Sequence, residues 1–169
     1  MIIYPDYYCN KVTDISIELL QQNNIKGIIL DVDNTLIDFD KNMLDGVLEW
    51  VESLKQNNFK CIILSNSNKL EKVKNVAKEL DIPYIYFAKK PLKIGFRKAQ
   101  KKLEIENENI AVVGDQIFTD ILGANRSKMF SILVNPISQK DIWMTKIKRP
   151  LEEKIIKEYV KKQKRKEDK

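Results

Sequence analysis

Hydrophobic and polar positions follow two different periods along the chain, and the two periods alternate. Short, nearly continuous apolar runs are typical of strands buried in a parallel sheet, whereas apolar positions three or four residues apart indicate amphipathic helices. Five runs of the first kind predict strands: Lys26–Asp31, Phe59–Leu64, Tyr84–Phe87, Ile110–Val113 and Ser131–Val134. Five patterns of the second kind predict helices: Val12–Gln22, Leu44–Leu54, Lys69–Leu80, Lys93–Leu103 and Phe118–Asn125.

This alternation of strands and helices predicts an α/β fold. Successive βα units form parallel strands with right-handed crossovers, so we expect a doubly wound three-layer α/β/α sandwich around a five-stranded parallel sheet. A chain of 169 residues suits one buried core, and we expect a single domain, 1–169, with its core at 26–134. Residues 136–169 are expected to form a C-terminal extension, with a helix from about Leu151 and a solvated basic tail.

The chain contains no histidine, and this absence excludes whole classes of site. Ser-His-Asp and Cys-His catalysis need an imidazole, and so does histidine-ligated zinc. Acid-base chemistry therefore has to use carboxylates or lysines. The two cysteines, Cys9 and Cys61, lie far apart in sequence, and Cys61 belongs to an apolar predicted strand, so we expect a packed thiol there rather than a bridge or a metal ligand.

The net charge of +6 favours anionic partners such as phosphates, nucleic acid or acidic lipid, although a solvated lysine-rich surface is the commoner explanation of such an excess. No stretch approaches the roughly 20 apolar residues of a membrane span, and the first residues lack the basic start and apolar core of a signal peptide. We therefore expect a cytoplasmic protein, and peripheral contact with an anionic membrane at its inner face remains open.

Polar side chains follow the predicted strands where these strands end. Asp31 ends the first strand and Asp33 follows it, Ser65 and Asn66 follow the second strand, and Asp115 follows the fourth. Parallel strands share a carboxyl edge, where ligands bind in open α/β sheets, so we expect these groups to lie together. The same residue types also occur in turns and helix caps without any site, and one serine loop can both cap a helix and hold a phosphate.

A lysine and two further groups complete the candidate site. Lys90, directly before Pro91, follows the third strand and brings an ammonium group to the same edge, although Lys89 is an alternative and most lysines are surface residues. Thr35 and Asp120 are second-tier candidates. Asp120 either binds through water or holds a neighbouring ligand, or it is an ordinary acid at a helix start.

Carboxylates that converge from two strands suit a hard cation. Mg²⁺ prefers oxygen ligands in octahedral geometry and keeps several waters, so it fits this set far better than zinc does. We therefore expect Asp31, Asp33 and Asp115 to hold Mg²⁺.

Four short motifs occur in order along the chain: Asp31-x-Asp33-x-Thr35, then Ser65, then Lys90, then Gly114-Asp115 with Asp120. Over residues 26 to 134 they resemble the four motifs of the haloacid dehalogenase (HAD) superfamily phosphatases. The runs Asp-Val-Asp-Asn-Thr-Leu and Gly-Asp-Gln-x-x-Thr-Asp are similar to those of subfamily IIIA, and within it of YqeG-like proteins.

This resemblance implies a phosphatase that forms an aspartyl-phosphate. Asp31 would attack phosphorus, and Asp33 would protonate the leaving oxygen, activate water and offer its main-chain carbonyl to Mg²⁺. The other motif residues would serve the phosphate or the loop: Ser65, Asn66 and Lys90 would bind the transferred group, and Thr35 would brace the loop.

The motif spacing leaves no room for a cap domain, because about 30 residues separate Asp33 from Ser65 and about 25 separate Ser65 from Lys90. An open site suits a phosphate on a macromolecule or a lipid headgroup, unless a partner subunit supplies the lid. The pattern from Gly114 to Arg126 is also similar to that of phosphatidylglycerophosphate phosphatases, which implies a lipid substrate. Arg126 is a candidate for binding a second anionic group, unless it only covers the helix end.

Two other functions remain open. A soluble phosphatase would act on nucleotides, sugar phosphates or nucleic-acid ends, whereas a basic RNA- or ribosome-binding protein would carry a vestigial site. Trp143 and Met144, with basic neighbours up to Arg149, fit either an interfacial patch or, more simply, a final helix packed on the sheet. The sequence leaves the oligomeric state open.

Overall fold

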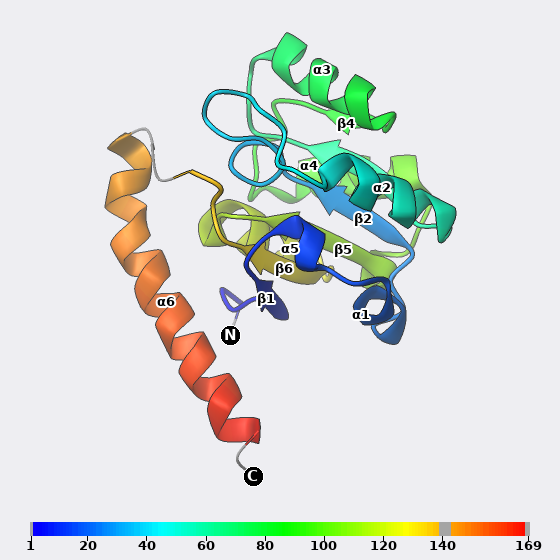
Figure 1. Ribbon diagram of the computed structural model, residues 1–169. Coiled ribbons are helices and arrows are strands. Elements are labelled where there is room, and N and C mark those ends of the chain that lie inside the picture. The colour runs from blue at the N-terminus through cyan, green and yellow to red at the C-terminus, as the bar shows by residue number, and fades with distance from the viewer. Residues whose placement is uncertain (1, 139–142, 168–169) are drawn as a thin grey trace.

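The computed structural model describes residues 2–138 and 143–167, and for 143–149 and 164–167 it describes the backbone alone. The side chains of Trp143 and Met144, and those of the basic end of the chain, therefore lie outside the described part. The predicted three-layer α/β fold is confirmed (Figure 1). Every strand pair is parallel, and the strands run across the sheet in this order: β1 (Tyr7–Cys9), β6 (Phe130–Val134), β5 (Ile110–Gly114), β2 (Gly27–Leu30), β3 (Lys60–Leu64) and β4 (Tyr84–Ile85).

The sheet has six strands where the sequence predicts five. The additional strand, β1, is only three residues long and half-buried, and it pairs with β6 so that Tyr7 lies opposite Ile132. A strand this short at a sheet edge has too few apolar positions to show a period. The five predicted strands are all present, and each of their ends lies within two residues of the predicted position.

Helices cover both faces of the sheet because neighbouring strand residues point to opposite sides. Ile28 and Leu30 pack in one cluster with the first group of helices, whereas Ile29 between them packs in another cluster with the second group. The first group consists of α1 (Ile17–Gln22), α2 (Val47–Gln56) and α3 (Leu70–Leu80). The second consists of α4 (Lys93–Leu103) and α5 (Leu122–Arg126).

Two predicted helices are interrupted in the structure. The pattern at 12–22 forms a 3₁₀ turn, Val12–Asp14, and then α1, which begins after Ser16 because the Ser16 hydroxyl accepts a hydrogen bond from the Leu19 N–H at 3.1 Å. The pattern at 118–125 begins as a π-helical turn, Ile117–Ile121, and continues as α5. A hydrophobic period does not reveal either change of helix type.

A long final helix, α6 (Trp143–Glu167), begins before the predicted start near Leu151 and contains Pro150 (Figure 1). It contacts the body of the fold through Ile155, which packs with Ile117, Ile121 and Leu133. The Glu152 carboxylate accepts a hydrogen bond from the Ile117 N–H at 3.0 Å, at the start of the π-helical turn. No helix in the described ranges is long and apolar enough to cross a bilayer.

Phe96 holds α4 against α5, and its removal is a direct test of this packing. The ring is fully buried, and a Cβ atom at Gly123 of α5 would overlap with it. We expect Phe96→Ala to lower the free energy of unfolding by about 3–5 kcal/mol in urea titrations. Ile94→Ala, on the same helix but 55% exposed, is the control and should change it by less than about 0.5 kcal/mol. Equal losses in the two variants would contradict this packing.

Candidate functional site

The carboxyl edge of the sheet brings together two of the three acids predicted to hold the metal, Asp31 and Asp115, whereas the predicted place of the Asp33 carboxylate in this cluster is wrong. Asp31 directly follows the buried strand β2, and its N–H donates to the Val113 carbonyl of β5 at 3.0 Å. Asp115 directly follows β5. Because β2 and β5 are paired neighbours, the residues that directly follow them, Asp31 and Asp115, lie at the same point of the sheet edge.

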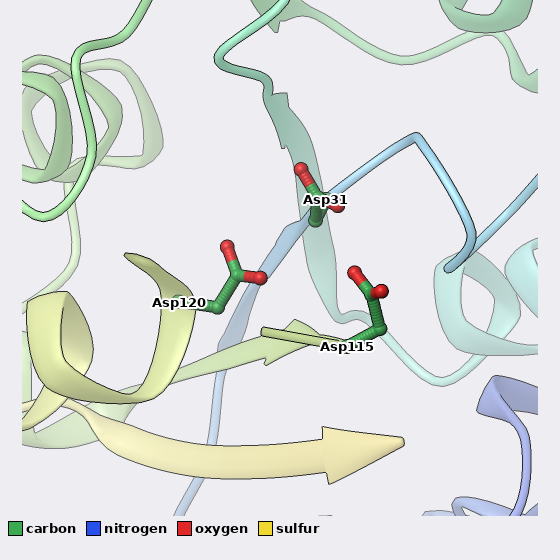
Figure 2. Close-up of side chains that lie close together, drawn as sticks. All are labelled: Asp31, Asp115 and Asp120. Atoms are coloured by element: carbon green, nitrogen blue, oxygen red, sulfur yellow. The ribbon is translucent and has the colours of Figure 1, made fainter. Parts of the chain in front are cut away.

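Three carboxylates form a cluster at this edge: Asp31, Asp115 and Asp120, with one oxygen of each within 4.8 Å of the others. Figure 2 shows them converging from the ends of β2 and β5 and from the helical turn after β5. The sequence placed Asp120 only in the second tier, but it is almost completely buried in this cluster.

Gly114 makes the approach of Asp120 feasible. A Cβ atom at position 114 would overlap with the carboxyl group of Asp120, so a side chain there would push this acid out of the cluster. The Asp120 carboxylate also accepts a hydrogen bond from the Gln116 N–H at 3.2 Å, across the π-helical turn. Helical distortions of this kind are frequent at functional sites.

Lys90 joins two of the three acids. Its Nζ donates to Asp31 Oδ1 at 2.6 Å and to Asp120 Oδ1 at 2.5 Å, and its side chain is only 3% exposed. Asn66 fixes the Lys90 backbone, because its Oδ1 accepts from the Lys90 N–H at 2.6 Å and its Nδ2 donates to the Lys90 carbonyl at 3.0 Å. Lys89 instead lies exposed over the Phe87 ring, so Lys90 is the lysine that points inward.

Burial and the repulsion between the carboxylates shift the pKa values of the residues in this cluster. Burial raises the pKa of Asp31 to about 7, although Lys90 opposes the rise, and Asp120 and Asp33 add to it. Burial also raises the pKa of Asp115 well above its usual range, with further contributions from Asp31 and Asp120. Burial lowers the pKa of Lys90, but the two carboxylates outweigh that effect and raise it overall.

The carboxylate of Asp33 does not belong to the cluster of Asp31, Asp115 and Asp120. Its side chain is 46% exposed and forms an ion pair with Lys72 of α3, with Nζ 2.5 Å from Oδ1. The predicted metal role of Asp33 thus depends on its main-chain carbonyl, as the resemblance implied. Nothing in the sequence singled out Lys72, because one lysine near a helix start among many carries no signal.

Of the remaining predicted residues, Thr35 contacts the clustered acids, whereas Arg126 lies in a separate pocket. Thr35 Oγ1 lies 3.4 Å from an oxygen of Asp31 and 3.4 Å from one of Asp115, which suits the bracing role. Ser65 is fully buried, and its hydroxyl accepts from the Ser67 N–H at 3.1 Å. Arg126 lines a pocket to which none of the three clustered acids contributes. The phosphate-binding roles of Ser65, Asn66 and Lys90 stay predictions.

The donor set fits a hard divalent cation such as Mg²⁺. All three clustered groups offer carboxylate oxygens, and a single ammonium group does not balance three negative charges. Two of the acids have raised pKa values, which means that their ionised forms are unfavourable until more positive charge arrives.

Mg²⁺ is expected to stabilise the fold most at alkaline pH. Asp31 titrates near pH 7 when folded but near its ordinary value of 3.8 when unfolded, so the folded protein holds more protons and the metal-free fold loses stability as the pH rises between these values. In thermal scans, a Mg²⁺ concentration about 100 times the Kd at pH 8 should raise Tm by about 5 °C or more at pH 8, and the same concentration should raise it by less at pH 6, where protons compete for the carboxylates.

Asp115→Asn should remove most of this shift, and Asp40→Asn, in the exposed loop after Asp33, is the matched control. A scan in NaCl at the same ionic strength measures the part of the Tm shift that comes from the screening of charges alone. An equal shift in the Asp115→Asn variant would place the cation elsewhere.

Comparison with known proteins shows which family this sequence resembles along most of its length. The family model described as mitochondrial PGP phosphatase matches residues 1–138. The protein "Probable phosphatase YqeG" of Bacillus subtilis (strain 168) is 38% identical over 153 residues, which cover 90% of this chain and 88% of that protein.

Solved structures support the fold. An uncharacterized protein from Listeria monocytogenes serotype 4b is 23% identical with a TM-score of 0.58, and the match covers 69% of this chain and 84% of that one. The HAD-hydrolase YfnB from Bacillus subtilis, described as bound to magnesium, is 12% identical with a TM-score of 0.58, covering 70% and 90%.

Proposed function

Because the chain belongs to the PGP phosphatase family of HAD-type phosphatases, we propose that it hydrolyses phosphate monoesters with Mg²⁺ through a phosphorylated Asp31. The observation that carries this proposal is the buried Lys90–Asp31 ion pair at the end of β2. A nucleophilic carboxylate must be ionised, and the ammonium group 2.6 Å away favours that form against the effect of burial.

In the first half of the reaction an Asp31 oxygen bonds to phosphorus, and the bond from phosphorus to the ester oxygen breaks. Asp33 gives its proton to the leaving oxygen. In the second half the Asp33 carboxylate takes a proton from water, the water oxygen bonds to phosphorus, and the bond to Asp31 breaks. Lys72 Nζ lies 2.5 Å from Asp33 Oδ1, so this contact fixes the position of the carboxyl group that carries the proton. Both acids thus return to their starting states.

The other residues bind and orient the phosphate. Lys90 offers positive charge beside Asp31 and so favours the transferred group, and Asn66 keeps Lys90 in place. Mg²⁺, held by Asp31, Asp115 and the main-chain carbonyl of Asp33 with Asp120 nearby, would supply the charge that neutralises phosphoryl oxygens. Ser65 lies in the loop after β3, where its hydroxyl suits a phosphate oxygen.

Exposed apolar side chains near Lys90 favour a lipid substrate. Four of the nine exposed large hydrophobic residues in the described chain belong to the segment around Lys90, and we call them the apolar rim: Tyr86, Phe87, Leu92 and Ile94. Lys89 and Lys93 in the same segment are exposed as well. Apolar side chains flanked by cations suit the surface of an anionic bilayer.

The backbone of this segment turns Phe87 and Lys90 in different directions. Phe87 and Lys89 both have positive φ, 49° and 57°, a conformation that is uncommon for residues with side chains. Phe87 stays 54% exposed while Lys90 is buried. Together with the membership in the PGP phosphatase family, the rim supports phosphatidylglycerophosphate, or a similar lipid phosphate, as the substrate, with the protein at the inner membrane face.

No separate cap stands over the site in the described chain. The interval from Asp33 to Ser65 contains a loop with two isolated β-bridges, α2 and β3, and the interval from Ser65 to Lys90 contains α3 and β4. A bulky phosphate ester therefore has room at the edge of the sheet.

Asp31→Asn should abolish turnover, because an amide is a poor nucleophile for phosphorus. We expect phosphate release from p-nitrophenyl phosphate with Mg²⁺ to fall at least about 1000-fold, and Asp33→Asn to slow it by about 100-fold or more. Asp40→Asn is again the control. Full activity in the Asp31→Asn variant would overturn the assignment of the nucleophile.

The lipid proposal predicts that the apolar rim matters only at a membrane. The double substitution Phe87→Ser with Ile94→Ser should lower turnover of phosphatidylglycerophosphate in anionic vesicles by about tenfold or more, because two apolar side chains no longer insert. Turnover of p-nitrophenyl phosphate should not change. Ile2→Ser, at a 52% exposed apolar residue outside the rim, is the matched control.

Two results would redirect the proposal. Turnover of soluble esters alone, with no preference for vesicles, would favour a soluble phosphatase of nucleotides, sugar phosphates or nucleic-acid ends. Salt-sensitive RNA binding without any turnover would favour the RNA- or ribosome-binding function.

A further inference from the structure

A polar pocket lies on the side of the sheet covered by α4 and α5. It has a volume of about 230 Å³, and it opens between α4, the short 3₁₀ turn Asn107–Asn109 and the residues that link α5 to β6. Its polar lining consists of Lys93, Arg97, Asn107, Arg126, Ser127 and Lys128. None of the residues assigned to phosphoryl transfer lines it.

Four cationic side chains line this pocket, and none of them has a carboxylate partner among the described residues. Lys93, Arg97, Arg126 and Lys128 are all exposed. Gathering four like charges around a small volume is unfavourable unless an anion joins them.

The helix dipoles favour the positions of two of these four cations and disfavour the position of Lys93. Arg126 is the last residue of α5 and Lys128 lies two residues beyond it, where cations complement the helix dipole. Lys93 and Arg97 lie in the first two turns of α4, and Lys93 is the first residue of that helix, where the dipole disfavours a cation. The same N-terminal position favours a bound anion.

Ser127 supplies an independent observation. The residue is 8% exposed, and its hydroxyl oxygen is buried without a hydrogen-bond partner among the residues that the structure describes. An unsatisfied buried hydroxyl costs about 1–3 kcal/mol, so such groups in native proteins ordinarily have a partner. Ser127 is also one of the residues that line the pocket, so an anion bound there is a candidate partner for its hydroxyl.

We propose that this pocket binds a multiply charged phosphate anion of the pyrophosphate class, separately from the phosphoryl-transfer site. The forked donors of Arg97 and Arg126, with two ammonium groups, suit several phosphate oxygens at once. The lining includes no aromatic side chain, so nothing stacks on a nucleobase. The volume is below the roughly 300 Å³ of pockets for larger ligands, which favours the phosphate portion itself as the recognised group.

Pyrophosphate binding in EDTA tests this proposal without interference from the acidic cluster. With no divalent cation present, three carboxylates and one ammonium group repel anions from that site. Isothermal titration and thermal scans with the full chain should show saturable binding of pyrophosphate, stronger than that of inorganic phosphate. NaCl at equal ionic strength should not reproduce the thermal shift.

Three variants make the test specific. Arg126→Gln should weaken pyrophosphate binding about tenfold or more, because it removes a charge-assisted contact. Ser127→Ala should also weaken it, and without pyrophosphate its Tm should be no lower than that of the wild type, because it removes an unsatisfied hydroxyl. Lys98→Gln, which removes an exposed charge from α4 outside the pocket, should bind as the wild type does.

Three outcomes would overturn the proposal: no saturable binding, an equal shift with NaCl, or the same loss of affinity in Lys98→Gln as in Arg126→Gln. Thermal scans in NaCl alone show whether each variant is folded. Phosphatase activity is not the readout, so failure here leaves the proposed reaction untouched.

Discussion

The ammonium group of Lys90 between two buried aspartates is the interaction on which this site depends. Its Nζ lies 2.6 Å from Asp31 and 2.5 Å from Asp120, where an unpartnered charge would be very costly. This contact ties together three separate parts of the chain: the end of β2, the segment before α4 and the π-helical turn after β5. Asn66 fixes the lysine backbone, and Gly114 leaves the space that Asp120 occupies. The fold thus holds a charge arrangement that its own residues do not fully neutralise.

That incomplete neutralisation connects stability with chemistry. A carboxylate whose pKa lies near 7 because of burial is ready to accept a cation, and, once ionised, to attack an electrophile. Asp33, exposed and paired with Lys72, has a different environment from Asp31 only two residues away. Two acids in unlike surroundings can take two roles, nucleophile and proton carrier, and this division replaces the histidine that the chain lacks.

The sequence predicted the residues that follow long apolar strands and missed those placed by packing. Asp31 and Asp115 could be found because a buried strand delivers its next residues to a known edge, and Lys90 because it precedes Pro91 after the third strand. The same argument was wrong for the Asp33 carboxylate, which pairs with Lys72 instead. The three-residue strand β1 has no readable period. The place of Asp120 depends on a π-helical turn, and the Lys72–Asp33 pair depends on how α3 packs. The pocket around Ser127 joins residues from α4 and the end of α5, and only the folded chain brings them together.

The most direct test of the account is to find the phosphate on the protein during turnover. Asp33→Asn enzyme mixed with p-nitrophenyl phosphate and Mg²⁺, quenched in acid within milliseconds, would be weighed intact and then mapped by peptide mass spectrometry. The account predicts a chain heavier by one phosphoryl group, located on Asp31, that accumulates because the base for its hydrolysis is missing. Turnover by the wild-type enzyme with no such adduct in either protein, or an adduct on another residue, would contradict it.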